Sequence, residues 1–195
     1  MKSFYTFFIA ILSISCGAEQ QNNNASNTAA TTGNMHSSHS AAFNQTFKLA
    51  LDGYYALKDQ FIKENDTAIN GTAQRLLLLV DQIKFDSLGV DSAVVTTAKS
   101  YADGISAELK GLIGEKNITE KRKAFQMIGE QYYDFIRTVQ FDQEVVYHQF
   151  CPMAFDNEGA YWLSNSRIIQ NPYLPKKMIT CGEVRDSIDL RSIKH

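Results

Sequence analysis

Histidine and cysteine are scarce in this chain of 195 residues, which holds four histidines and three cysteines. No histidine falls between residues 43 and 139, and the pattern Glu-x-x-His does not occur. Ferritin-like di-iron bundles need such pairs on inward helix faces, so a di-iron oxidase is excluded. His148 and Cys151 lie three residues apart, but no orienting group or oxyanion site accompanies them. We therefore expect no enzymatic activity and name no catalytic residue.

An excess of charge of either sign is also lacking. The chain has 19 basic and 21 acidic residues, a net charge of -2, and no long basic run. Nothing in this balance indicates nucleic acid or an anionic membrane surface as a partner. The composition, 44% hydrophobic and 21% charged, is that of a soluble globular protein. The length allows one compact domain, a leader and a linker.

The apolar run near the start is too short to span a bilayer. It covers residues 4–14, follows Lys2 and ends in Ser-Ile-Ser-Cys16-Gly. This pattern resembles a bacterial lipoprotein signal, in which the cysteine becomes the lipidated N-terminus. We expect a signal over residues 1–16 and a membrane-anchored protein of the periplasm or cell envelope. A plain secretory signal with an incidental cysteine is the alternative.

The next segment, 17–41, is rich in Asn, Ser, Thr and Ala and has no apolar period, which predicts a disordered polar tether. Four stretches with helical spacing of apolar residues follow, and their expected caps are Asp66 or Thr67, Asp91 or Ser92, and Thr119. Short connections between helices of similar length favour antiparallel neighbours. We expect a mainly α fold: an up-down four-helix bundle within a single domain over residues 42–195.

A small C-terminal cap is expected over about residues 141–184. The helical period fades there, and β-prone triplets alternate with Gly, Asn and Pro turn signals. The prediction is a loop-rich cap with two or three short strands, packed on the bundle and containing the only tryptophan, Trp162.

Two soft-ligand clusters lie in this cap, Cys151-x-Met153 and Met178-x-x-Cys181. Thiolate and thioether sulfur favour Cu(I), so the two clusters together could form a copper site, with His148 as an additional or replacement ligand. The alternative is a Cys151–Cys181 disulfide, because two cysteines in an exported domain are the count for one bridge. Closing that loop would stabilise the domain by roughly 3 to 4 kcal/mol. The residues alone leave both open.

The order of motifs resembles a known family. The motifs begin at Tyr147-His-Gln-Phe-Cys-Pro-Met, Gly159-Ala-Tyr-Trp-Leu-Ser, Ile169-Gln-Asn-Pro-Tyr and Met178-Ile-Thr-Cys-Gly. They resemble the domain of unknown function 3347, found in exported bacterial lipoproteins and on periplasmic adaptor subunits of heavy-metal efflux pumps. The resemblance extends over about residues 43–184 and departs from the family at Leu174-Pro175. It implies a copper-related accessory role beside an efflux adaptor or pump and no known enzymatic activity.

Overall fold

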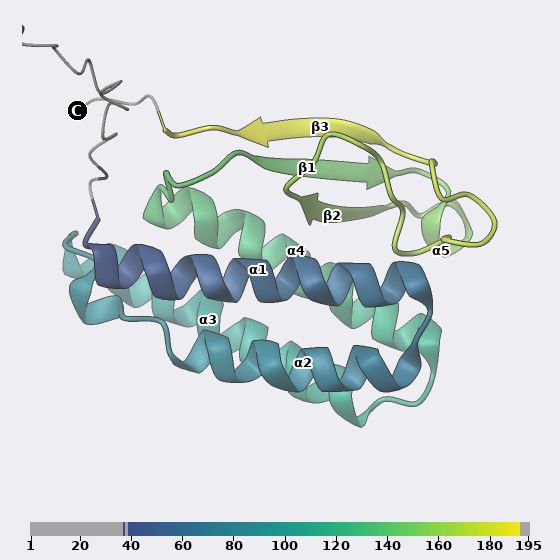
Figure 1. Cartoon of the computed structure of the whole chain (residues 1–195), viewed down its shortest axis with the longest axis horizontal. Helices are drawn as coiled ribbons and strands as arrows, with labels where there is room; N and C mark the ends of the chain where they lie inside the picture. Colours follow the sequence, from purple (N-terminus) through teal and green to yellow (C-terminus); the bar gives the residue numbers. More distant parts are fainter. Residues whose placement is uncertain (1–36, 38, 192–195) are drawn as a thin grey trace, which may run out of the picture. The chain divides into compact units, whose positions relative to one another are not determined.

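The structure is a computed structural model that describes residue 37 and residues 39–191. The expected signal, its Cys16 and most of the tether lie outside these residues. Four long helices form the body of the described part: α1 (Ala41–Lys63), α2 (Asp66–Asp81), α3 (Ser92–Gly114) and α4 (Ile118–Val139). Each packs against the next along the chain (Figure 1). The predicted mainly α fold of four packed helices is confirmed.

Helix starts follow local capping chemistry. Ser40 and Asp91 cap α1 and α3, and the second of these was expected. Asn65 and Asn117 cap α2 and α4, so the caps predicted at Asp66 or Thr67 and at Thr119 are wrong. In both cases the asparagine one or two positions earlier already accepts the bond from a first-turn N–H. None of the helices in residues 39–191 is long and apolar enough to cross a membrane.

The bundle core is aromatic. Tyr54 of α1 stacks on Phe125 of α4 with ring centroids 5.0 Å apart, and it also contacts Tyr132. Phe47 meets Phe135 edge-on at 4.8 Å. All five side chains are fully buried. Large rings meeting across α1 and α4 supply apolar burial and specific geometry together, which holds these two helices in one register.

A small antiparallel sheet covers one side of the bundle. It consists of β1 (Val146–Cys151), β2 (Ala160–Ser164) and β3 (Glu183–Ile188), in the order β2-β1-β3. The prediction of two or three short strands in the cap is confirmed. β2 lies against α4, and the whole sheet runs alongside α1 and α4 in Figure 1. Two short elements complete the described part, η1 (Phe85–Ser87) and α5 (Ala154–Asn157).

Strand β3 lies beyond most of the expected cap. Its sequence, Glu-Val-Arg-Asp-Ser-Ile, lacks a clear alternation of apolar and polar residues, and most of its side chains are exposed. It is a strand because it pairs with β1 from Val146↔Ile188 to Phe150↔Glu183. A β-bulge at Arg185 interrupts that pairing. Bulges and charged side chains on an edge strand discourage it from pairing with strands of other chains.

Candidate functional site

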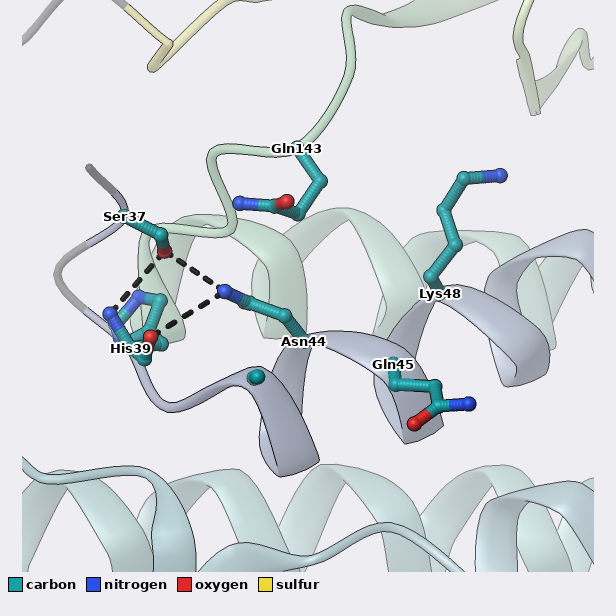
Figure 2. Close-up of a pocket in the computed structure, with 7 residues that line it drawn as sticks. Ser37, His39, Asn44, Gln45, Lys48 and Gln143 are labelled. Carbon is teal, nitrogen blue, oxygen red and sulfur yellow. Dashed lines mark hydrogen bonds between the residues drawn. The ribbon is translucent and has the colours of Figure 1, made fainter. Parts of the chain in front are cut away.

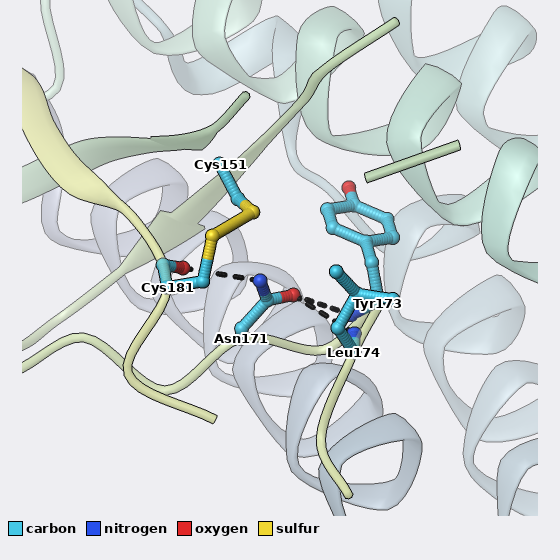
Figure 3. Close-up of a disulfide and its surroundings, with 5 residues drawn as sticks. All are labelled: Cys151, Asn171, Tyr173, Leu174 and Cys181. Atoms are coloured by element: carbon cyan, nitrogen blue, oxygen red, sulfur yellow. Dashed lines mark hydrogen bonds between the residues drawn. A yellow bond between two sulfur atoms is a disulfide. The ribbon is translucent and has the colours of Figure 1, made fainter. Parts of the chain in front are cut away.

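A disulfide joins Cys151 to Cys181 at the end of the sheet (Figure 3). Cys151 is the last residue of β1, and Cys181 comes two residues before β3. The two Cα atoms are 5.7 Å apart, and the bond bridges a sequence separation of 30 residues. The two soft-ligand clusters of the sequence therefore meet in space, with their thiols bonded to each other.

The buried side chain of Asn171 organises the loop that carries Cys181. Its Nδ2 donates to the Cys181 carbonyl at 3.0 Å, and its Oδ1 accepts from the backbone N–H groups of Tyr173 and Leu174 at 2.8 and 3.1 Å. Its own N–H donates to the Ile179 carbonyl at 2.8 Å. Figure 3 shows this asparagine between the disulfide and Tyr173. The Asn171 side chain thus forms hydrogen bonds with the backbone at both ends of the loop, and these bonds fix the position of Cys181.

Gly182 allows the chain to turn from the disulfide into β3. It has a φ of +140°, a conformation that residues with a Cβ rarely adopt. A Cβ there would lie 2.8 Å from both the Phe150 carbonyl oxygen and the Trp162 ring. The residue after Cys181 must therefore be glycine for the disulfide to form where it does.

Trp162 and Tyr173 anchor the cap on the bundle. Their rings meet edge-on at 5.9 Å, and Tyr173 also packs against Phe125 of α4 at 6.2 Å. The Tyr173 hydroxyl donates to the Tyr161 carbonyl. Burial raises the pKa of Tyr173 well above its ordinary value, so this hydroxyl remains a donor at any physiological pH.

The two methionines of the expected copper site lie on the outside of the cap. Met153 is 45% exposed and Met178 is 38% exposed, whereas Cys151 is fully buried. The Met178 carbonyl accepts from the Cys181 N–H at 3.0 Å, so Met178 and Cys181 share one turn. While the disulfide is intact, neither cysteine can supply a thiolate, and the exposed sulfur ligands are the two thioethers.

His148 does not join these sulfur atoms. It is three residues from Cys151 on β1, and alternation along a strand places the two side chains on opposite faces. The imidazole lies between the rings of Tyr133 and Tyr161, with centroids at 4.1 and 4.5 Å. The pKa of His148 is lowered to about 4, mainly because the ring is buried; Asp186 opposes this shift and Arg137 adds to it. His148, expected as an additional or replacement ligand, thus lies on the other face of β1 from Cys151.

In the part of the chain that the structure describes, no three His, Cys, Asp or Glu side chains gather closely enough to hold a metal ion.

An ionic cluster that the sequence did not reveal ties the cap loop to the bundle. Arg122 of α4 donates through Nε to the Pro172 carbonyl at 3.1 Å and through Nη2 to Glu64 at 3.0 Å. Glu64, just after α1, also pairs with Lys176 of the loop. The hydrogen bond from Lys176 lowers the pKa of Glu64, and Arg122 adds to the effect. Residues so distant in sequence carry no local signal of this contact.

A second polar feature lies at the other end of α1. A shallow cleft of about 590 Å³ is lined by Ser37, His39, Asn44, Gln45, Lys48 and Gln143, among others (Figure 2). Ser37 Oγ accepts from the His39 N–H and from Asn44 Nδ2, at 3.1 and 2.8 Å. Lys48 pairs with Asp52 and Glu144. These contacts join the start of α1 to the segment after α4.

Comparison with known proteins adds one match. Residues 50–144 match the family described as "Protein of unknown function (DUF3347)". No curated protein and no solved structure matches the chain. The matched region runs from within α1 to just before β1, so it covers the bundle and not the cap motifs. The chain therefore contains a domain of the DUF3347 family, whose function is unknown, in its residues 50–144.

Proposed function

We propose that this protein is an exported, non-enzymatic accessory protein, anchored to a membrane through Cys16, that binds Cu(I) through its cap when the disulfide is reduced. It would serve heavy-metal efflux or homeostasis beside an efflux adaptor or pump. The observation that carries the proposal is the meeting of Cys151 with Cys181, with Met153 and Met178 exposed on the same cap.

The chemistry of the sulfur ligands supports copper over harder cations. An external dithiol, itself oxidised to a disulfide by exchange, supplies the two electrons and two protons that convert the Cys151–Cys181 bond to two thiols. A bound Cu(I) then displaces thiol protons. Thiolates and thioethers are soft ligands, which suit Cu(I) and not Mg2+ or Ca2+. Because Cys151 and Cys181 are already neighbours, little rearrangement of the cap is needed to bring the two sulfur atoms onto one ion.

The proposed location agrees with the same bond. Disulfides persist in oxidising compartments and are rare in the cytosol. The link to efflux adaptors comes from the resemblance of the cap motifs, and the anchor comes from the lipoprotein-like leader.

Titration of Cu(I) into reduced protein against a competing chelator tests the proposal. We expect one Cu(I) per chain, loss of binding in a Cys151→Ser, Cys181→Ser double variant, and weaker binding in Met153→Leu with Met178→Leu. Met127→Leu is the matched control, because Met127 is 49% exposed on α4 and should not change the affinity. An unchanged affinity in the double serine variant refutes copper binding by the cap.

A second candidate is a partner-binding lipoprotein domain whose helical bundle docks an adaptor and whose disulfide is a permanent staple. The complete burial of Cys151 and the hydrogen bonds of Asn171 around Cys181 favour it. Mass spectrometry of the unreduced mature protein distinguishes the two. An intact Cys151–Cys181 bond that resists mild reductant, together with no copper uptake, would select the staple.

A further inference from the structure

Two neighbouring loop segments of the cap share an unusual surface pattern. Each places basic residues directly before exposed apolar ones: Arg167-Ile168 in the first, and Lys176-Lys177-Met178-Ile179 in the second. Ile168 is 73% exposed, and Ile179 is 37% exposed. Exposed aliphatic side chains do not gain the free energy that burial away from water would provide. Where several of them lie together on a surface, they indicate a site of contact with another molecule or with a membrane.

The two segments are held together by the contacts that surround the disulfide. Asn171, three residues after Ile168, is bonded to the Ile179 carbonyl and to the Cys181 carbonyl. The Met178 N–H donates to the Leu174 carbonyl at 2.8 Å, which folds the second segment into a turn. The disulfide brings exposed Met153 to the same region. The first segment begins where β2 ends, beside Tyr147 of β1, and the chain then crosses the sheet to the loop beside α5, where the disulfide lies (Figure 1). We call Arg167, Ile168 and residues 176–179 the cap rim.

The charge of this region differs from that of the chain. The loop 165–182 contains Arg167, Lys176 and Lys177 and no acidic residue, whereas the whole protein has a net charge of -2. Lys177 is exposed. The Arg167 guanidinium lies over the Tyr147 ring at 5.5 Å. Lys176 pairs with Glu64, although its side chain is 80% exposed. The basic residues come from two separate segments, so no basic run marks them in the sequence.

We propose that the cap rim is a membrane-contact surface that seats the cap on an anionic lipid bilayer. Isoleucine side chains enter the boundary between headgroups and acyl chains, while Lys and Arg bury their aliphatic stems and reach the phosphates. Basic charge combined with single exposed aliphatic side chains suits this boundary. A protein interface would more typically present aromatic anchors at its centre.

The proposal rests on the anchoring proposed above, which keeps the domain near a bilayer. The 24 residues from Gly17 to Ser40 can extend to about 80 Å at most. The 23 residues of α1 span about 35 Å, and the rim is tied to the far end of that helix through the Lys176–Glu64 pair. The tether is thus long enough for the rim to reach the membrane even though the chain enters the domain at the opposite end of α1.

Hydrogen–deuterium exchange of the full lipidated protein tests this contact. The protein is reconstituted into vesicles of phosphatidylcholine, with or without phosphatidylglycerol. We expect slower amide exchange in residues 166–169 and 176–180 only in the anionic vesicles, and loss of the effect at high salt. Each basic residue near an anionic surface strengthens binding about fivefold. Arg167→Glu with Lys177→Glu should therefore weaken the contact at least about 25-fold and remove the protection.

The matched control reverses one arginine and one lysine away from the rim. Arg75 of α2 and Lys84 before η1 are both exposed, so Arg75→Glu with Lys84→Glu makes the same change in net charge. This control should keep the protection.

Three outcomes overturn the proposal: equal protection in neutral and anionic vesicles, protection that survives reversal at the rim, or protection that appears only when envelope proteins are added. The mass of the intact protein reports lipid on Cys16 separately. If lipid is absent, flotation of the soluble protein with the two kinds of vesicle tests the rim alone.

Discussion

The contact between Tyr54 and Gly129 gives the sharpest test of how the cap and the bundle fit together. Tyr54 of α1 is fully buried, and its hydroxyl accepts a hydrogen bond from the Leu163 N–H of β2 at 3.1 Å. On α4, a Cβ added to Gly129 would lie 2.8 Å from the Tyr54 hydroxyl oxygen but 3.6 Å from the ring carbon that carries it. Because Gly129 has no side chain, the Tyr54 hydroxyl has room to accept the hydrogen bond from the Leu163 N–H of β2.

These distances predict that the effect of Gly129→Ala reverses sign with the residue at position 54. In the natural protein the added methyl displaces the hydroxyl, and a buried donor left without its acceptor costs about 1–3 kcal/mol. This exceeds the roughly 1 kcal/mol that alanine gains over glycine within a helix. Tyr54→Phe alone should cost about 1–3 kcal/mol for the same reason. In the Tyr54→Phe background the clash is gone, so Gly129→Ala should then stabilise the protein by up to about 1 kcal/mol.

Equilibrium urea unfolding of the four proteins in this cycle measures the free energy of unfolding and its coupling. We expect a coupling of about 1–3 kcal/mol, which is the cost of the lost hydrogen bond. Gly71→Ala on α2 is the control, because a Cβ there meets nothing within 4 Å and should raise stability equally in both backgrounds. If Gly129→Ala destabilises both backgrounds by the same amount, the hydroxyl contact does not explain this glycine.

Three further predictions concern the cap. Cys181→Ser should lower the free energy of unfolding by about 3 to 4 kcal/mol, because the lost bond to Cys151 closes a long loop. Urea unfolding of the variant and of the unreduced natural protein measures this difference. Equal stability of the two proteins would show that the bond does not form. Lys176 lowers the pKa of Glu64 in the folded protein. The ionised Glu64 therefore stabilises the fold at pH values above its pKa in the unfolded chain, and this stabilisation is lost as pH falls through its pKa in the folded protein. Glu64→Gln should flatten the stability profile at acidic pH, and a profile parallel to that of the natural protein would contradict this. The pKa of His148 is lowered to about 4, so protonation of its ring favours the unfolded chain. The free energy of unfolding should therefore fall as pH drops from about 6.5 towards 4, and His148→Phe should lessen this loss. NMR titration of the His148 ring measures its pKa.

The helices were predictable because their signals are local. Apolar residues repeat at helical spacing within each segment, and a polar side chain stands near each start. The caps of α2 and α4 were misplaced by one or two residues, because Asn65 precedes Asp66 and Asn117 precedes Thr119, and either neighbour is chemically able to cap. Only the backbone geometry at the helix start distinguishes them.

The cap was predictable in composition but not in arrangement. Its rare residues marked it, and the pairing of Cys151 with Cys181 was one of two alternatives that spacing left open. Strand β3 carries little β signal of its own and exists because β1 offers it a partner. The strand alternation that separates His148 from Cys151 requires knowing that β1 includes both residues.

The sequence by itself determined the four-helix pattern, the position of the cap and the set of residues able to do chemistry there, because each of these depends on neighbours along the chain. Tertiary structure decided that the two cysteines bond to each other, that His148 is enclosed by Tyr133 and Tyr161, and that Arg122 and Lys176 both pair with Glu64. These outcomes depend on contacts between distant segments. Which such contacts form is set by packing of the whole domain and leaves no local trace in the sequence.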